Sequence, residues 1–330
     1  MALRPGSRRG RSRSFFKRRK PFYKRRKGPF RTLTRRLATA ADYVLAAFAK
    51  FAARGLKRAD PDASSDFMGR LARNFGPWLP ASRVGRANLR RAFPEKSKEE
   101  IEKILTGVWD NLGRVAGEFV HLDKLWDYDD RRPNAGRIET FNVDRFIGLY
   151  TDEKPALMFS AHLANWELAA VGARRYGLDS AVLFRMPNNR FIADFIQETR
   201  ADLMSQLVPT GSEAALFLAG VIERGGHLGM LVDQHRKPGA RVNFFGRPCW
   251  ANPTIARLAR HYDCPVHGAR VVRLPQNRFR IELTRALDLP RDAEGKIDVG
   301  PAMQTITSVI EGWVREHPEQ WLWLHRRWRD

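Results

Sequence analysis

The stretch ALMFSAHLANWELAA, residues 156–170, passes from an apolar run to a helix-like pattern. Residues 156–161 are predicted to form a buried strand, and Asn165 can cap a following helix that has Glu167 at its second position. His162 lies at this junction, and open α/β sheets carry their active sites at the carboxyl ends of strands. The stretch therefore predicts both an α/β fold and the place where its chemistry occurs.

Strand and helix patterns alternate after this junction. The predicted strands are ALMFSAH, SAVLFR, HLGMLVDQ and CPVHGARVVRL, and the predicted helices cover residues 165–176, 190–204, 212–223 and 252–262. RFRIELTRALDL follows a turn signal and is predicted to add an antiparallel strand. The alternation predicts an α/β fold with a largely parallel central sheet flanked by helices. Residues 37–125 are predicted to be helical, with a capping box formed by Ser97 and Glu100.

The positive charge of the chain is concentrated at its N-terminus. The formal net charge of the chain is +23. Sixteen Lys and Arg residues precede position 38, whereas the first acidic residue is Asp42. A segment without acids and with so many cations cannot form a core, so residues 1–36 are predicted to be a disordered polybasic tail. Its partner would be a polyanion, either lipid or nucleic acid. Residues 59–330 are predicted to form one catalytic domain, helical over 59–125 and α/β over 135–330.

Residues 37–58 are predicted to form a membrane-associated amphipathic helix. Its apolar stripe includes Leu37, Val44, Leu45, Phe48 and Phe51, but the segment is too short and too charged to cross a bilayer. A basic leader followed by such a helix is typical of proteins that lie on an anionic membrane. A core-packing helix and an organelle transit peptide are the alternatives.

The two cysteines lack C-x-x-C spacing and indicate a reducing compartment.

His162 and Glu167 form an H-x4-E pair, and a second match runs from His325 to Asp330. Composition gives roughly one such match by chance, so structural context has to decide between them. Residues five apart meet poorly on one helix, but a break after His162 lets the imidazole fold back over the first turn. The imidazole would then take a proton from an alcohol while Glu167 holds the other ring nitrogen. Without a G-x-S-x-G elbow, this favours acyl transfer onto a bound hydroxyl, and a satisfied core histidine is the alternative.

Four blocks of the sequence, in order, resemble the lipid A biosynthesis (lauroyl/myristoyl) acyltransferases, a family of the lysophospholipid acyltransferase-like superfamily. The blocks are SAHLANWELAA, LFRMPNNRFIADFIQETR, the segment from GMLVDQ through NFFG to ARVVRL, and EGWVREHPEQWLWLHRRWRD, and they cover residues 135–330. The resemblance implies a glycerolipid acyltransferase-like fold over the domain 59–330. It also implies transfer of an acyl chain from acyl carrier protein to a hydroxyl of a lipid A precursor, in lipopolysaccharide biosynthesis and without a cofactor. The expected location is the cytoplasmic face of the Gram-negative inner membrane, as a peripheral or monotopic protein.

The resemblance also implies roles for particular residues. His162 and Glu167 correspond to the catalytic histidine-acid motif. Arg185 corresponds to an arginine that contacts a substrate phosphate or sugar, because a guanidinium suits bidentate phosphate contacts. Asn189, with Asn188, is expected to position substrate, and a turn formed by the asparagine pair is the alternative.

Asp233 and Gln234 close a predicted strand, and we expect them to face the same cleft as His162 and to hydrogen-bond substrate. His235 beside them suggests a metal, but no third ligand has a suitable spacing, so no metal site is expected. Two other functions stay open. One is acyl transfer to another lysolipid or a glycolipid. The other is nucleic-acid binding through the tail, which is disfavoured because no nucleic-acid-binding fold signature accompanies it.

Overall fold

The structure, a computed structural model, describes residues 29–329 apart from residues 130, 133–134, 188, 202 and 212–213. The chain divides into two units, residues 1–43 and 44–330, and the boundary falls within helix α1 (Pro29–Arg58). Proline is favoured at the first position of a helix, and α1 begins at Pro29, before the predicted start at residue 37. Residues 29–36 are therefore helical rather than disordered, and the rest of the predicted tail lies outside the described residues. No helix in the described part of the chain has the length and hydropathy to cross a bilayer.

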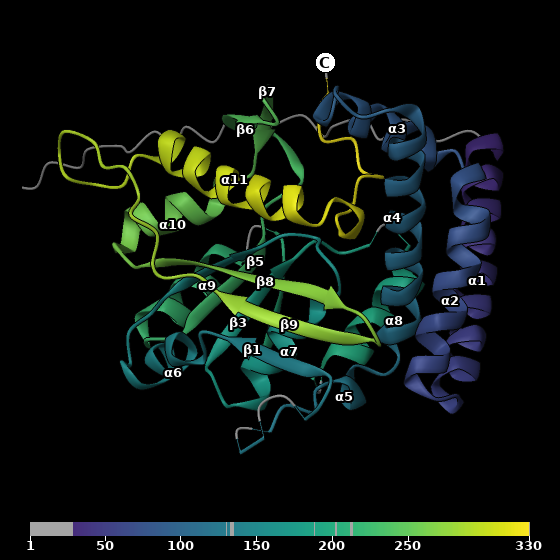
Figure 1. Cartoon of the computed structure of the whole chain (residues 1–330), viewed down its shortest axis with the longest axis horizontal. Coiled ribbons are helices and arrows are strands. Elements are labelled where there is room, and N and C mark those ends of the chain that lie inside the picture. The colour runs from purple at the N-terminus through teal and green to yellow at the C-terminus, as the bar shows by residue number, and fades with distance from the viewer. Residues whose placement is uncertain are drawn as a thin grey trace, which may run out of the picture. The chain divides into compact units, whose positions relative to one another are not determined.

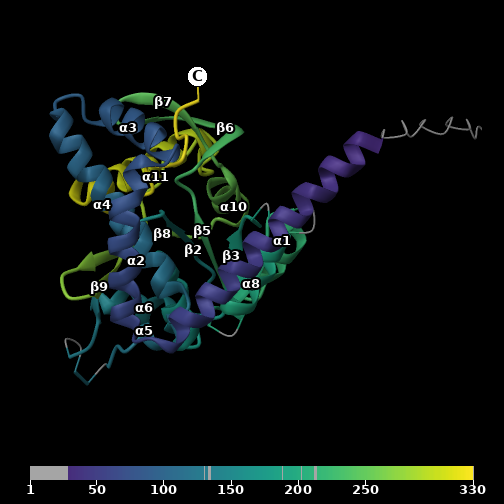
Figure 2. The same ribbon diagram turned by 90° about the vertical axis from the view of Figure 1, so that its right-hand side faces the viewer.

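Helices form the N-terminal part of the second unit, as predicted for residues 59–125. They are α2 (Pro61–Phe75), the 3-10 turn η1 (Gly76–Trp78), α3 (Ala81–Ala92), α4 (Lys98–Phe119) and α5 (Leu122–Leu125). The predicted capping box of Ser97 and Glu100 is confirmed at the start of α4. Helices α2 and α4 lie side by side (Figures 1 and 2). Their close approach requires glycine, because a Cβ on Gly117 would lie 2.5 Å from the carbonyl oxygen of Ser64.

A seven-stranded sheet forms the centre of the α/β region, in the order β1-β9-β8-β2-β5-β3-β4. The strands that the sequence predicted are β2 (Leu157–Ser160), β3 (Ser180–Phe184), β5 (His227–Leu231), β8 (Val266–Leu274) and β9 (Arg278–Leu283). Among the described residues the paired strands of this sheet are parallel, except that β8 and β9 are antiparallel. The predicted α/β fold with a largely parallel sheet is therefore confirmed.

The sequence patterns did not predict several elements of this region, including helix α11 (Val299–Glu316). β1 (Ile138–Phe141) and β4 (Gln206–Pro209) have four residues each, too few to show a clear period. Helix α6 (Val143–Thr151) is also short. The antiparallel hairpin of β6 (His235–Phe244) and β7 (Arg247–Ala251) is separate from the main sheet. Its turn contains two left-handed residues, Phe245 (φ 52°) and Gly246 (φ 67°).

Helices cover both faces of the sheet (Figure 1). The predicted helices after the first strand are α7 (Glu167–Arg175), α8 (Arg190–Ala201), α9 (Ala214–Glu223) and α10 (Thr254–Tyr262), and α11 (Val299–Glu316) precedes the 3-10 turn η2 (Pro318–Gln320). Phe159 of β2 stacks on Trp313 of α11, with 5.5 Å between ring centroids. Because successive strand residues face opposite sides, Met158 and Ser160 face the layer that contains α7.

A buried ion pair joins the helical region to the sheet. Arg273 of β8 donates from Nη2 to Glu118 Oε2 at 2.9 Å, and its Nη1 donates to the other carboxylate oxygen. Ser65 and Asn165 also donate to this carboxylate, at 2.6 and 2.9 Å. Burial opposes the ionisation of Glu118, but Arg273 and the two donors hold its pKa below the ordinary value. Because Asn165 belongs to the junction after β2, Glu118 anchors that junction to α4.

Glu118→Ala should lower the free energy of unfolding by about 3–5 kcal/mol, because Arg273 would remain buried without its counter-charge. Urea unfolding followed by circular dichroism measures the change. The double variant Glu118→Leu with Arg273→Met removes both charges and should lose much less stability. If the double variant loses as much as Glu118→Ala, the lost packing rather than the unpaired charge accounts for the effect.

Candidate active site

His162 and Asp233 occupy equivalent positions on neighbouring strands. β2 and β5 are parallel, and Ser160 pairs with Leu231 at their carboxyl ends. Each of the two polar residues lies two positions beyond its strand, so the register brings them to the same edge of the sheet. This is the edge at which open α/β sheets bind their ligands.

The carboxylate of Asp233 holds the imidazole of His162. The ring Nδ1 lies 2.8 Å from Asp233 Oδ1, and the backbone N–H of His162 donates to Oδ2 at 2.8 Å. Trp321, after α11, donates from Nε1 to the same Oδ2 at 2.8 Å. Burial opposes ionisation, but His162 and these donors outweigh it and lower the pKa of Asp233 to about 2. The ionised carboxylate keeps a proton on Nδ1, which leaves Nε2 of His162 as the basic nitrogen.

Gln234 faces this basic nitrogen. Its Nε2 lies 3.2 Å from Nε2 of His162, so the amide donates to the imidazole lone pair. Both residues line a cavity. A substrate hydroxyl that reaches the imidazole must therefore take the place of the Gln234 amide.

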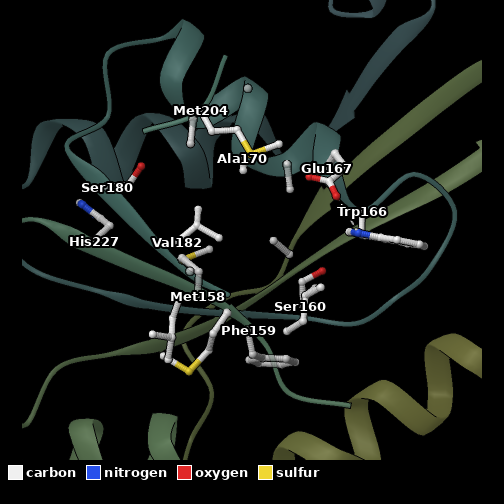
Figure 3. A pocket seen from close by; sticks show the side chains of 18 of the residues that line it. Met158, Phe159, Ser160, Trp166, Glu167, Ala170, Ser180, Val182, Met204 and His227 are labelled. Atoms are coloured by element: carbon white, nitrogen blue, oxygen red, sulfur yellow. Dashed lines mark hydrogen bonds between the residues drawn. The ribbon is translucent and has the colours of Figure 1, made fainter. Parts of the chain in front are cut away.

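The predicted contact between Glu167 and His162 is wrong. Glu167 Oε2 accepts from Arg200 Nε at 3.0 Å, Oε1 accepts from Trp166 Nε1 at 3.0 Å, and Arg200 Nη2 also donates to Oε1. The turn after His162 contains Ala164 in the left-handed region (φ 46°), and α7 begins at Glu167 itself, which directs this carboxylate toward α8. The imidazole does lie against the start of α7, but it packs on the ring of Trp166 at 5.1 Å between centroids. Figure 3 shows Trp166 and Glu167 side by side at one end of the cavity.

The other predicted site residues lie in different settings. Arg185 follows β3, is exposed and lines the cavity. Asn189 instead accepts from the backbone N–H groups of Phe191 and Ile192 at 3.0 and 3.2 Å, and so caps α8. Asn188 lies outside the described residues. Asp233, predicted to contact substrate, is instead buried behind the imidazole with its side chain only 2% exposed.

A cavity of about 1110 Å³ opens in front of Nε2 of His162. One sheet face lines it with alternate residues of three strands: Met158 and Ser160, Ser180, Val182 and Phe184, and His227, Gly229 and Leu231. α7 covers this face with Trp166, Ala169 and Ala170 (Figure 3). A second apolar part is lined by α6 and includes the half-exposed Ile147 and Tyr150. The polar and basic residues of the lining include Arg185, Arg200, Gln234, His235 and Arg236, and Gln234 contacts His162. The cavity thus combines a polar mouth with apolar walls.

The C-terminal segment contributes contacts that the spacing of motifs did not predict. Trp321 and Trp323 are buried, and Trp321 donates to Asp233. The backbone N–H of His235 donates to Nε2 of His325 at 3.3 Å. Burial lowers the pKa of His325 to about 4, and it is close enough to Asp233 for that charge to act on it. The second H-x4-D match therefore also lies near the site.

Comparison with known proteins agrees with the resemblance of the four blocks. The sequence pattern of the family described as bacterial lipid A biosynthesis acyltransferase matches residues 30–330. A lipid A biosynthesis palmitoleoyltransferase of Escherichia coli (strain K12) is 24% identical over 249 residues, which are 74% of this chain and 78% of the relative. A lipid A biosynthesis lauroyltransferase of the same organism is 22% identical over 266 residues, 79% of this chain and 83% of the relative. The pattern covers nearly the whole chain, and the chain belongs to the bacterial lipid A biosynthesis acyltransferase family.

Proposed function

We propose that this protein transfers a fatty acyl chain from acyl carrier protein to a hydroxyl of a lipid A precursor. The observation that carries the proposal is the basic Nε2 of His162, held by Asp233 at the polar mouth of a large apolar cavity. A general base at a polar mouth suits an acceptor hydroxyl, and apolar walls suit an acyl chain. The relatives are named for palmitoleoyl and lauroyl transfer, which move acyl groups of this kind.

His162 acts first as a general base and then as a general acid. Nε2 takes the proton of the acceptor hydroxyl while the hydroxyl oxygen attacks the thioester carbonyl carbon of the donor, and Asp233 stabilises the imidazolium that forms. When the tetrahedral intermediate collapses, the C–S bond breaks and the imidazolium gives its proton to the leaving thiolate. The products are the ester and the free carrier thiol, and no enzyme atom is acylated.

Basic side chains at the mouth bind the anionic groups of both substrates. Arg185 lies there, and we assign it to a substrate phosphate or sugar. Arg200 is fixed by Glu167, so Glu167 acts as a positioning residue for this cation and for Trp166. The same positive charge steers the acidic carrier protein toward the mouth. Asn189 supports this arrangement by capping the helix that carries Arg200.

The acceptor is a lipid, and apolar side chains on the helical region offer a contact with the membrane. Phe48 and Phe51 of α1 are 70% and 73% exposed, and Phe67 and Phe75 of α2 and Trp78 of η1 are also exposed. Together with the basic residues of the N-terminus, this surface gives two membrane signals where one would be marginal. We therefore place the enzyme at the cytoplasmic face of the inner membrane as a peripheral or monotopic protein.

Asp233→Asn should lower kcat by about 10²–10⁴-fold without unfolding the protein. Oδ2 of Asp233 accepts two N–H groups, so the asparagine oxygen would take that place and turn its NH₂ group toward Nδ1 of the ring. The ring proton would then move to Nε2, the nitrogen that has to be basic. Rates of ester formation from acyl carrier protein and a lipid A precursor, followed by mass spectrometry, measure the loss.

Matched variants separate the two carboxylates. His162→Ala should lose as much activity as Asp233→Asn, whereas Glu167→Gln should raise KM for the acceptor with a smaller loss of kcat. His261→Ala, on the exposed face of α10, should be fully active. Full activity in a folded His162→Ala variant would refute the assignment of the base.

Intact-protein mass spectrometry after incubation with donor alone should show unmodified enzyme. Burial raises the pKa of the Cys249 thiol, and raises that of Cys264 to about 11, so both thiols stay protonated and unreactive at neutral pH. A stable acyl adduct on either cysteine or on Ser160 would show a two-step transfer through the enzyme instead.

Deleting residues 2–36 should weaken binding to anionic liposomes and make the remaining binding less salt-sensitive, because each basic residue near such a surface contributes about 1 kcal/mol. Adding Phe48→Asp and Phe51→Asp to the truncated protein should remove most of the remaining liposome binding. Liposome sedimentation measures both effects, and activity on detergent-dispersed acceptor should be retained. If the truncated protein binds liposomes as well as the full chain, and the tail peptide prefers RNA to lipid at physiological salt, the tail has another partner.

A further inference from the structure

One branch of the cavity ends on a polar wall far from His162. Ser180 and His227 begin β3 and β5 and pair directly across these strands. They are 7% and 4% exposed, and Leu178 and Met204, which also line the cavity, are buried. Figure 3 shows His227 and Ser180 at one end of the cavity and Ser160, Trp166 and Glu167 at the other.

His227 is a buried polar residue. Neither of its ring nitrogens makes a well-formed hydrogen bond among the described residues, although the backbone of Asp179 is close enough to act on its pKa, whereas Ser180 Oγ donates to Ser205 Oγ at 2.8 Å. Burial lowers the pKa of His227, so the ring is neutral. A buried polar group without a partner costs free energy. Core packing alone does not account for a histidine at this position, whereas a role toward a ligand in the cavity does.

The sheet face between the two ends is open at one residue. Gly229 lies on the same face as His227 and pairs with Met158 on one side and with Val182 on the other. A Cβ added to Gly229 would meet only atoms of Val182 and Ala181, at 3.8 and 3.9 Å. Because no side chain fills the space above Gly229, an extended ligand can pass from the mouth to His227.

We propose that the acyl chain of the donor lies along this strand face and that His227 stops its methyl end, so that His227 sets the length of the transferred chain. The inference rests on the acyl transfer proposed above. A chain that is too long would press its methyl group against the buried ring of His227. The wall formed by Ser180 and His227 therefore rejects long chains by contact.

The strand register gives the length of the path. His227 lies four residues before Leu231, which pairs with Ser160, and His162 lies two residues further on. At about 3.3 Å per residue the path is roughly 20 Å long. An extended chain advances about 1.25 Å per carbon, so roughly 12 to 14 carbons fit once contact distances are subtracted.

Acyl carrier proteins loaded with saturated chains of graded length test the proposal in transfer assays. His227→Ala should move the preferred chain longer by about two carbons or more, because the polar wall is removed. Gly229→Leu should move it shorter, because a side chain then blocks the path. His261→Ala, on the exposed face of α10 and outside the cavity lining, should keep the wild-type preference. Circular dichroism and thermal unfolding verify that each variant is folded.

An unchanged length preference in folded and active His227→Ala and Gly229→Leu variants would overturn the role of His227. Calorimetric binding of free fatty acids of the same lengths separates this failure from failure of the proposed function. One outcome is that the wild type transfers no acyl chain, yet the preferred fatty-acid length shifts in the two variants as expected. His227 then limits the chain length, and the proposed reaction is wrong. If fatty-acid binding has no length preference in the wild type or in either variant, His227 does not limit the chain length.

Discussion

The buried carboxylate of Asp233 is the group on which the site depends. It binds His162 at the end of β2, lies just beyond β5, and accepts from Trp321 in the C-terminal segment. An ionised group so far from water is stable only when donors satisfy it, and here three N–H groups do so. The sheet register, the position of the histidine and the course of the C-terminal segment are therefore coupled through one side chain.

Three buried carboxylates have three separate partners. Asp233 pairs with an imidazole, Glu118 with Arg273, and Glu167 with Arg200. Asn165 connects two of these systems, because its amide donates to Glu118 while its oxygen accepts from the backbone of Glu167. The N-terminal helices are thus part of the support of the site, since α4 fixes the junction that carries the histidine.

The sequence predicted much of the sheet, because the apolar runs of β2, β3, β5 and β8 are bounded by clear turns and helices, whereas β1 and β4 are too short to show a period. The sequence also led us to expect the site at the junction at His162, where the structure brings His162 and Asp233 together. The sequence did not predict the carboxylate that binds His162, because the H-x4-E spacing indicated Glu167. Asp233 lies 71 residues from His162 in the sequence, and strand pairing brings the two residues together. Local spacing does not encode such a contact. The signal that was available is that both residues lie at the carboxyl end of a predicted strand.

We infer that Asp233, and not Glu167, determines which nitrogen of the His162 ring carries the proton. ¹⁵N NMR of protein labelled at histidine tests it most directly, with the His162 resonances assigned by their loss in His162→Gln. We expect a proton on Nδ1 in the wild type and in Glu167→Gln, and a shift of that proton to Nε2 in Asp233→Asn. A ring that keeps its Nδ1 proton in Asp233→Asn, or loses it in Glu167→Gln, would show that Asp233 does not set the tautomer of His162.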